Sequence, residues 1–152
     1  MTVSEIMTRK VASVSPTVSF KEIWRIIFKN KVNSVPVVDK EMRLIGIITR
    51  EELLERLYPD YQELFAFDDE LPDLENMEQK LGDLARLTAA HLMRKRVIHA
   101  HEEAHIMRAL SRMIIHHINQ MPVVTEDGKL IGMVTKGDIF YSLFKKNIRR
   151  KK

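Results

Sequence analysis

VNSVPVVDKEMRLIGIIT (residues 32–49) and INQMPVVTEDGKLIGMVT (residues 118–135) are two versions of one pattern, 86 positions apart. The same shift aligns the first third of the chain with the last third without a gap, and it gives ten identities over residues 3–54. The identical pairs are Met7/Met93, Val11/Val97, Asn33/Asn119, Pro36/Pro122, Val37/Val123, Val38/Val124, Leu44/Leu130, Ile45/Ile131, Gly46/Gly132 and Thr49/Thr135. An internal repeat of this kind predicts two copies of one supersecondary unit.

Each repeat predicts the same order of elements: strand, helix, strand, strand, helix. The strands expected in the two repeats are, in pairs, 11–14 and 97–100, 35–38 and 121–124, and 44–49 and 130–135. A helix of about 13 residues should follow each first strand, because apolar residues recur there at helical spacing. The second hairpin has a strong turn signal in Asp127-Gly128. Closing helices should begin at Arg50 and Lys136.

We therefore predict an α/β (α+β) fold in which two pseudo-symmetric β-α-β-β-α repeats pack as one module. Neither repeat alone would bury enough apolar surface to be stable. The expected divisions are a first repeat at 1–57, an acidic and partly helical linker at 58–88, a second repeat at 89–144 and a basic tail at 145–152. Within the linker Pro59 and Pro72 act as breakers, and residues 76–93 could form a helix that leads into the second repeat.

The composition is that of a globular protein, with 45% hydrophobic and 30% charged residues among 152. The chain has no cysteine, which excludes disulfides and thiolate metal sites. No apolar run approaches the roughly 18 residues of a membrane span, and the N-terminus lacks the apolar core of a signal peptide. We expect a cytoplasmic protein with no membrane segment.

The charge is distributed unevenly along the chain. Residues 55–87 carry ten acids and three bases, whereas the last eight residues carry six bases. A basic tail can contact nucleic acid, anionic lipid or the acidic stretch of its own or a neighbouring chain, but it is commonly a solvated end. No recognition helix or aromatic-rich basic surface accompanies it, so the sequence does not favour nucleic-acid binding.

HEEAH (residues 101–105) matches the H-E-x-x-H pattern of zinc metalloproteases. That chemistry needs both histidines one turn apart on a formed helix. The repeat instead aligns HEEAH with SPTVS (15–19), the turn between first strand and first helix, so His101 should precede the helix. Glu102 and Glu103 suit a helix N-terminus, where acids interact favourably with the helix dipole. We predict no metal site and interpret the match as chance.

Each repeat resembles a CBS domain, named after cystathionine β-synthase. The resemblance rests on the opening Ile6-Met7-Thr8 and Leu92-Met93-Arg94, on the h-P-V-V strand and on the L-I-G-h-h-T run. Two CBS domains in tandem form a Bateman module. The resemblance implies a regulatory module that is not an enzyme, that binds AMP, ADP, ATP or S-adenosylmethionine between its repeats, and that commonly forms a homodimer. It needs no other cofactor, and its effector would be a separate, unknown protein.

The family's ligand motif, G-h-h-T/S-x-x-D, is complete in the second repeat at residues 132–138. Thr135 precedes a helix N-terminus, where free backbone N–H groups favour a phosphate, and the Asp138 carboxylate can accept hydrogen bonds from a ribose diol. By resemblance, these residues would face the other repeat. The ligand-binding residues implied for this site are Val11, Ala12, Val32, Asn33, Ser34, Val35, Pro36, Met133, Thr135, Lys136 and Asp138.

A second, weaker site is implied in the first repeat, where glutamate replaces the aspartate of the motif. Its residues would be Thr49, Glu52, Val97, Ile98, Asn119 and Gln120. Neither Asn33-Ser34 nor Asn119-Gln120 supplies the basic residues with which related nucleotide sensors hold phosphate. This favours AMP, S-adenosylmethionine or a neutral adenosine compound over a highly charged ligand.

Two functions stay open from the sequence. One is a stand-alone sensor that binds an adenosine compound and signals to a partner. The other is a ligand-free interaction module acting through CBS-mediated dimerisation, in which Thr135 is only a helix cap and Asp138 only a first-turn acid. An enzyme is not expected, because the chain shows no nucleophile with a base and no paired carboxylates.

Overall fold

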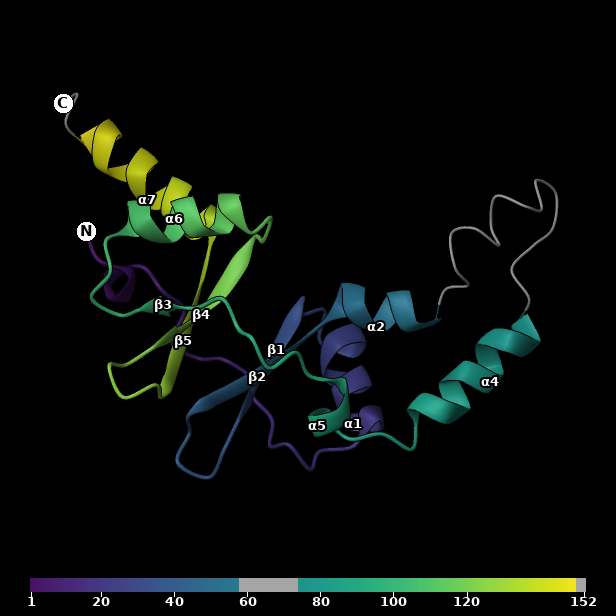
Figure 1. The fold of residues 1–152 in the computed structure, drawn as a ribbon. Coiled ribbons are helices and arrows are strands. Elements are labelled where there is room, and N and C mark those ends of the chain that lie inside the picture. Colours follow the sequence, from purple (N-terminus) through teal and green to yellow (C-terminus); the bar gives the residue numbers. More distant parts are fainter. Residues whose placement is uncertain (58–73, 150–152) are drawn as a thin grey trace, which may run out of the picture. The chain divides into compact units, whose positions relative to one another are not determined.

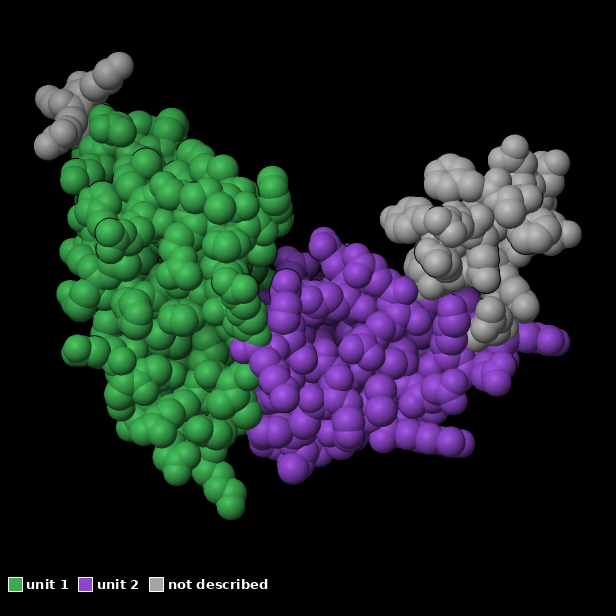
Figure 2. Space-filling model, in the orientation of Figure 1, with its two compact units in different colours: residues 1–12, 38–45, 96–152 green, residues 13–37, 46–95 purple. Residues whose placement is uncertain are grey.

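The computed structural model describes residues 1–57 and 74–149 and divides the chain into two compact units (Figure 2). Unit 1 comprises residues 1–12, 38–45 and 96–152, and unit 2 comprises residues 13–37 and 46–95. The first twelve residues therefore belong with most of the second repeat, a grouping that the repeat pattern does not reveal. Within the described ranges no helix is long and apolar enough to span a bilayer.

Unit 1 is built on a three-stranded sheet in the order β3-β4-β5 (Figure 1). Strand β3 (Ala100–His101) pairs parallel with β4 (Gln120–Val124), and β4 pairs antiparallel with β5 (Leu130–Thr135). Helices α6 (Ile106–Ile115) and α7 (Lys136–Arg149) contact each other. Their inner faces complete one apolar core, in which Met113, Met121 and Ile139 are fully buried.

The N-terminal segment is part of this unit. A short 3-10 helix, η1 (Val3–Glu5), places Val3 in the core, and Thr8 pairs with Met133 of β5 through two 2.9 Å backbone hydrogen bonds. This segment passes close to β5, because a Cβ placed on Gly132 would lie 2.8 Å from the Thr8 carbonyl oxygen and 2.8 Å from Met7 Sδ. Glycine is required at this position by the close approach of the chain.

Unit 2 contains α1 (Phe20–Trp24), the π-helical turn η2 (Arg25–Lys29), α2 (Arg50–Leu57), α4 (Leu74–Leu84) and α5 (Ala89–Leu92). It also holds most of the two-stranded sheet formed by β1 (Ser34–Val38) and β2 (Leu44–Thr49). Arg94 pairs with Ile47 of β2 as Thr8 pairs with Met133 of β5. Met93 then covers Gly46 as Met7 covers Gly132.

The predicted fold class is confirmed, and the order of elements holds except for the opening strand of the first repeat; three details differ. The strand expected at 11–14 is reduced to one bridge between Val14 and Val37, and only Ala100–His101 remains of the strand expected at 97–100. The first long helix is five α-helical residues followed by five π-helical ones. Residues 76–93 do not form one helix, because α4 ends at Leu84 and Thr88 caps a separate α5.

The rest of the linker, residues 58–73, and the end of the basic tail, residues 150–152, lie outside the described residues. Trp24 in α1 is only partly buried. It stacks between Phe20 and Phe28, with ring centroids 5.5 and 4.0 Å away. Its role is to join the aromatic residues along one side of α1 and η2.

Candidate functional site

In unit 1, Thr135 and Asp138 form a closed pair at the start of α7. The Thr135 backbone N–H donates to Asp138 Oδ2 at 2.9 Å, and the Asp138 backbone N–H donates to Thr135 Oγ1 at 3.0 Å. This reciprocal arrangement is a capping box, which satisfies two backbone donors at the helix N-terminus. The pair therefore has a structural role whether or not a ligand binds.

In unit 2, Thr49 and Glu52 form the same box at the start of α2. The Thr49 N–H donates to Glu52 Oε2 at 3.3 Å, and the Glu52 N–H donates to Thr49 Oγ1 at 3.2 Å. The longer glutamate side chain keeps this geometry. Its second oxygen, Oε1, lies 3.2 Å from Nη2 of Arg94 in an ion pair.

The two boxes differ in what remains available to a ligand. Asp138 Oδ1 has no hydrogen-bond partner among residues 1–57 and 74–149, and Asp138 is only partly buried. Both oxygens of Glu52 are engaged, one by Thr49 and one by Arg94. A carboxylate that binds a ribose diol must accept from its hydroxyl groups, so Asp138 is the better prepared acceptor.

Two further predicted residues lie beside these boxes. The Asn119 carbonyl oxygen accepts from the Lys136 backbone N–H at 2.9 Å in unit 1, and the Asn33 carbonyl oxygen accepts from the Arg50 backbone N–H at 2.9 Å in unit 2. The structure thus joins each asparagine to the motif of its own repeat. The family resemblance predicts Asn33 opposite Thr135 and Asn119 opposite Thr49, and these pairings stay predictions because they span both units.

The remaining predicted residues are divided between the units. Unit 1 holds Val11, Ala12, Met133, Val97, Ile98 and Gln120. Unit 2 holds Val32, Ser34, Val35 and Pro36. Val35 and Pro36 are buried, which leaves Val32, Asn33 and Ser34 as the accessible part of that segment.

Sequence analysis did not assign a role to Arg94. The signal was present, since the 86-residue shift aligns Arg94 with Thr8 and Glu52 with Asp138. The two differences meet in unit 2, where Arg94 forms an ion pair with Glu52 of the motif. They indicate that the two repeats have diverged at their candidate sites.

The histidines of HEEAH do not share a helical face. His101 ends β3, and His105 is the N-cap of α6, where its Nδ1 accepts from the Met107 backbone N–H at 3.2 Å. The prediction that His101 precedes the helix is confirmed. Across the part of the chain that the structure describes, no group of three or more His, Cys, Asp or Glu side chains is placed to hold a metal ion.

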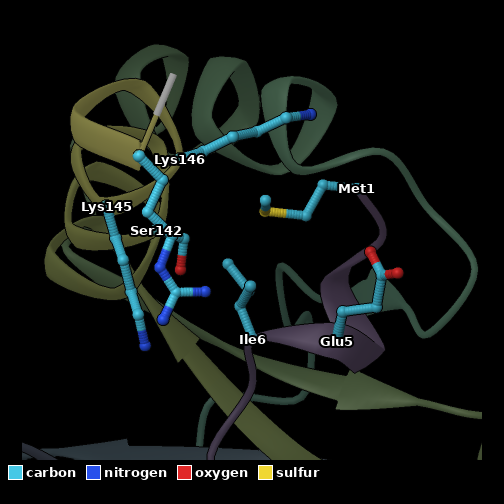
Figure 3. A pocket seen from close by; sticks show the side chains of 7 residues that line it. Met1, Glu5, Ile6, Ser142, Lys145 and Lys146 are labelled. Atoms are coloured by element: carbon cyan, nitrogen blue, oxygen red, sulfur yellow. The ribbon is translucent and has the colours of Figure 1, made fainter. Parts of the chain in front are cut away.

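A cavity of about 490 Å³ lies in unit 1 between the N-terminal segment and α7 (Figure 3). Its lining residues are Met1, Glu5, Ile6, Ser142, Lys145, Lys146 and Arg149. None of them is a predicted ligand residue. In Figure 3 the side chains of Lys145 and Lys146 extend away from each other, so these two cations do not converge on one point.

A family model for the CBS domain matches residues 3–59 and 89–145, which together make up more than half of the chain. The chain belongs to the CBS domain family. The two matched segments follow the two repeats, and the tandem arrangement is that of a Bateman module.

Relatives of this CBS-domain protein differ in how much of their length they share with it. Protein MJ1426 of Methanocaldococcus jannaschii is 28% identical, over 91% of this chain and 92% of its own. A homoserine O-acetyltransferase of Methanohalobium evestigatum is 25% identical over 90% of this chain, but this chain spans only 23% of that enzyme. The CBS pair is thus a small part of that much longer protein.

Solved structures share the fold along almost the whole chain. CBSX2, in a complex with AMP, has a TM-score of 0.74 and 20% identity, covering 96% of this chain and 98% of its own. The CBS domain pair of protein MJ0100, in a complex with 5′-methylthioadenosine and S-adenosyl-L-methionine, has a TM-score of 0.68 and 23% identity, with the same coverage. At these identities the likeness shows the fold alone.

Proposed function

We propose that this CBS pair is a regulatory module that binds an adenosine compound through Thr135 and Asp138 and passes the binding event to a separate effector protein. The observation that carries the proposal is the open Oδ1 of Asp138, held in place by the capping box at the start of α7. An acceptor fixed in this way loses little conformational entropy when a ribose hydroxyl donates to it. Two structures with the same fold hold AMP or S-adenosyl-L-methionine, which supports this ligand class.

The charge around the motif bears on which adenosine compound fits. Lys136 is partly exposed beside Thr135 and supplies one cation at the helix N-terminus. A single cation with backbone N–H groups suits one phosphate or a neutral substituent better than a triphosphate. AMP and S-adenosylmethionine are therefore the compounds to test first.

Thermal unfolding with AMP, ADP, ATP or S-adenosylmethionine tests this function. A ligand present at 100 times its Kd stabilises the native state by about 2.7 kcal/mol. For a chain of this size that corresponds to a rise in Tm of roughly 5–10 °C. If none of the four compounds raises Tm, the proposed ligand class is wrong.

Asp138→Asn is the matched variant, because asparagine can still accept the Thr135 N–H while replacing the open acceptor with an amide donor. Helix capping should survive, and the ligand-induced rise in Tm should fall sharply. Lys145→Gln, on an exposed position of the same helix, is the control and should leave the rise unchanged. If the ligand raises Tm equally in wild type and in Asp138→Asn, Asp138 is excluded as the acceptor of the ribose hydroxyl groups.

A second function, assembly without a ligand, is favoured by one specific observation. Seven large apolar residues on α6 and α7 of unit 1 are exposed, with exposed fractions from 46% to 69%. They are Met107, Ile114, Ile115, Phe140, Tyr141, Phe144 and Ile148. Exposed apolar patches of this kind commonly mark association surfaces.

We propose that a second copy of the chain covers this α6–α7 surface in a homodimer. Sedimentation of wild type should then give twice the mass of one 17.8 kDa chain. Phe144→Lys, at 66% exposure, should shift the protein to monomer without loss of helix content. A wild type that sediments as a monomer at all concentrations would refute the assembly. A dimer unchanged by Phe144→Lys would place the contact elsewhere.

A further inference from the structure

The two candidate sites differ at one position that both units use in the same way. Thr8 in unit 1 and Arg94 in unit 2 are aligned by the repeat, and each forms a two-way backbone bridge to a strand, Thr8 with Met133 and Arg94 with Ile47. The backbone is therefore equivalent at the two positions. The difference lies in the side chain, which is short and uncharged in one unit and long and cationic in the other.

In unit 2 this side chain reaches the candidate site itself. Arg94 Nη2 lies 3.2 Å from Glu52 Oε1, and the two side chains are 52% and 31% exposed. The contact is an ion pair, so the positive charge of the guanidinium attracts the carboxylate more strongly than a neutral hydroxyl group does. A ribose hydroxyl that approached Glu52 would have to share or displace the guanidinium.

No corresponding contact forms in unit 1. Thr8 is exposed, and Asp138 has no ion-pair partner within residues 1–57 and 74–149. The carboxylate of Asp138 is therefore not paired with a cation among these residues, whereas the carboxylate of Glu52 is paired with Arg94. The same capping box is left open in one unit and is occupied by the chain's own arginine in the other.

We infer that Arg94 acts as a built-in competitor of ribose at Glu52, and that it makes the chain take an adenosine ligand first at Thr135–Asp138. This inference rests on the proposed function. It states that the adenosine ligand occupies the site at Thr135–Asp138 before the site at Glu52, and that Arg94 sets this order. A half-exposed ion pair stabilises by at most about 1 kcal/mol, which corresponds to an affinity difference of about fivefold. The second site is weakened by at most this factor and is not abolished by it.

The experiment uses adenosine as its probe, because adenosine carries no phosphate that Arg94 could attract. In an Asp138→Asn chain, calorimetric titration reports the Thr49–Glu52 site. Adding Arg94→Thr, which installs the residue found at position 8, should lower the Kd for adenosine at this site by up to about fivefold. Lys95→Thr in the same background is the control, since Lys95 is the exposed neighbour of Arg94. It should leave the Kd unchanged.

The reciprocal change tests the same reasoning at the other site. Thr8→Arg in the otherwise wild-type chain should weaken the first adenosine binding step, because it brings a cation to Asp138. Circular dichroism and Tm of each variant establish that it is folded, and Arg94 is exposed enough for the change to be tolerated.

Each result has a definite meaning. Tighter adenosine binding on Arg94→Thr supports the inference, whereas unchanged or weaker binding overturns it and leaves the proposed function standing if wild type binds. If Arg94→Thr weakens the binding of AMP and leaves the binding of adenosine unchanged, Arg94 binds the phosphate group and the proposed competitor role is wrong. If wild type and all variants fail to bind adenosine and AMP, the proposed function fails together with the inference.

Discussion

Replacing Gly132 by alanine tests the closest approach of two segments within unit 1. The added Cβ would lie 2.8 Å from the Thr8 carbonyl oxygen, 2.8 Å from Met7 Sδ and 3.2 Å from Met7 Cγ. The methionine can rotate away, but the Thr8 carbonyl is main chain and is fixed by its hydrogen bond to the Met133 N–H. Relief requires the N-terminal segment to move off β5. Overpacking of a fixed site costs about 1–3 kcal/mol, and the involvement of backbone places Gly132→Ala near the upper end.

Urea denaturation of the variant and of Gly82→Ala measures this effect. Gly82 lies exposed in α4, and no atom lies within 4 Å of the position that an alanine methyl group would take there. Alanine at this position should therefore stabilise the chain by about 0.5–1 kcal/mol through helix propensity. The two alanine variants should shift the unfolding midpoint in opposite directions at an unchanged m-value. If Gly132→Ala lowers the unfolding free energy by less than about 0.5 kcal/mol, well below the overpacking range, the N-terminal segment does not cross β5 at Gly132.

Three further predictions concern the turns and one ionisable group. Gly128 has φ +86°, so Gly128→Ala should cost about 1 kcal/mol in denaturant unfolding, and an unaffected midpoint would contradict the left-handed turn. Met42 occupies the equivalent left-handed position with φ +64°, so Met42→Gly should be neutral or stabilising, unlike most glycine substitutions. The hydrogen bond from the Thr125 hydroxyl holds the pKa of Asp127 below its ordinary value. A carboxyl group whose pKa is lowered by folding stabilises the native state above its unfolded pKa of about 3.9, and this contribution is lost as pH falls through the lower pKa of the folded state. The stability advantage of wild type over Asp127→Asn should therefore shrink as pH falls from about 5 to about 3, and a constant difference would refute the linkage.

Short-range patterns predicted most of the secondary structure. The apolar runs and turn residues around 44–49 and 130–135 predicted strands with the observed bounds, and the closing helices begin at Arg50 and Lys136 as expected. The order of elements in each repeat was also predictable, because it follows from apolar periodicity within about ten residues. The first strands were not, since only backbone pairing with a distant segment decides whether an extended piece becomes a strand.

The candidate site was predictable in part. The motif at Thr135 and Asp138 is visible in the sequence, and so is the replacement of aspartate by Glu52. The sequence did not show that both pairs close into capping boxes, or that one oxygen of Asp138 stays open. Those features depend on side-chain positions at a helix start.

The sequence by itself determined the doubled pattern, the family and the two motifs, because a repeat is found by comparing the chain with itself and each motif consists of residues close together in the chain. Only the tertiary structure decided that residues 1–12 join the unit built around the second repeat, and that Arg94 reaches Glu52 although 42 positions separate them in the chain. The physical reason is that the opening segment of each repeat pairs with a strand through a backbone bridge, Thr8 with β5 and Arg94 with β2. This pairing fixes which side chain lies beside each site. Hydrogen bonds between segments so far apart leave no periodic signal in the sequence. Their effect becomes visible only when the chain is folded.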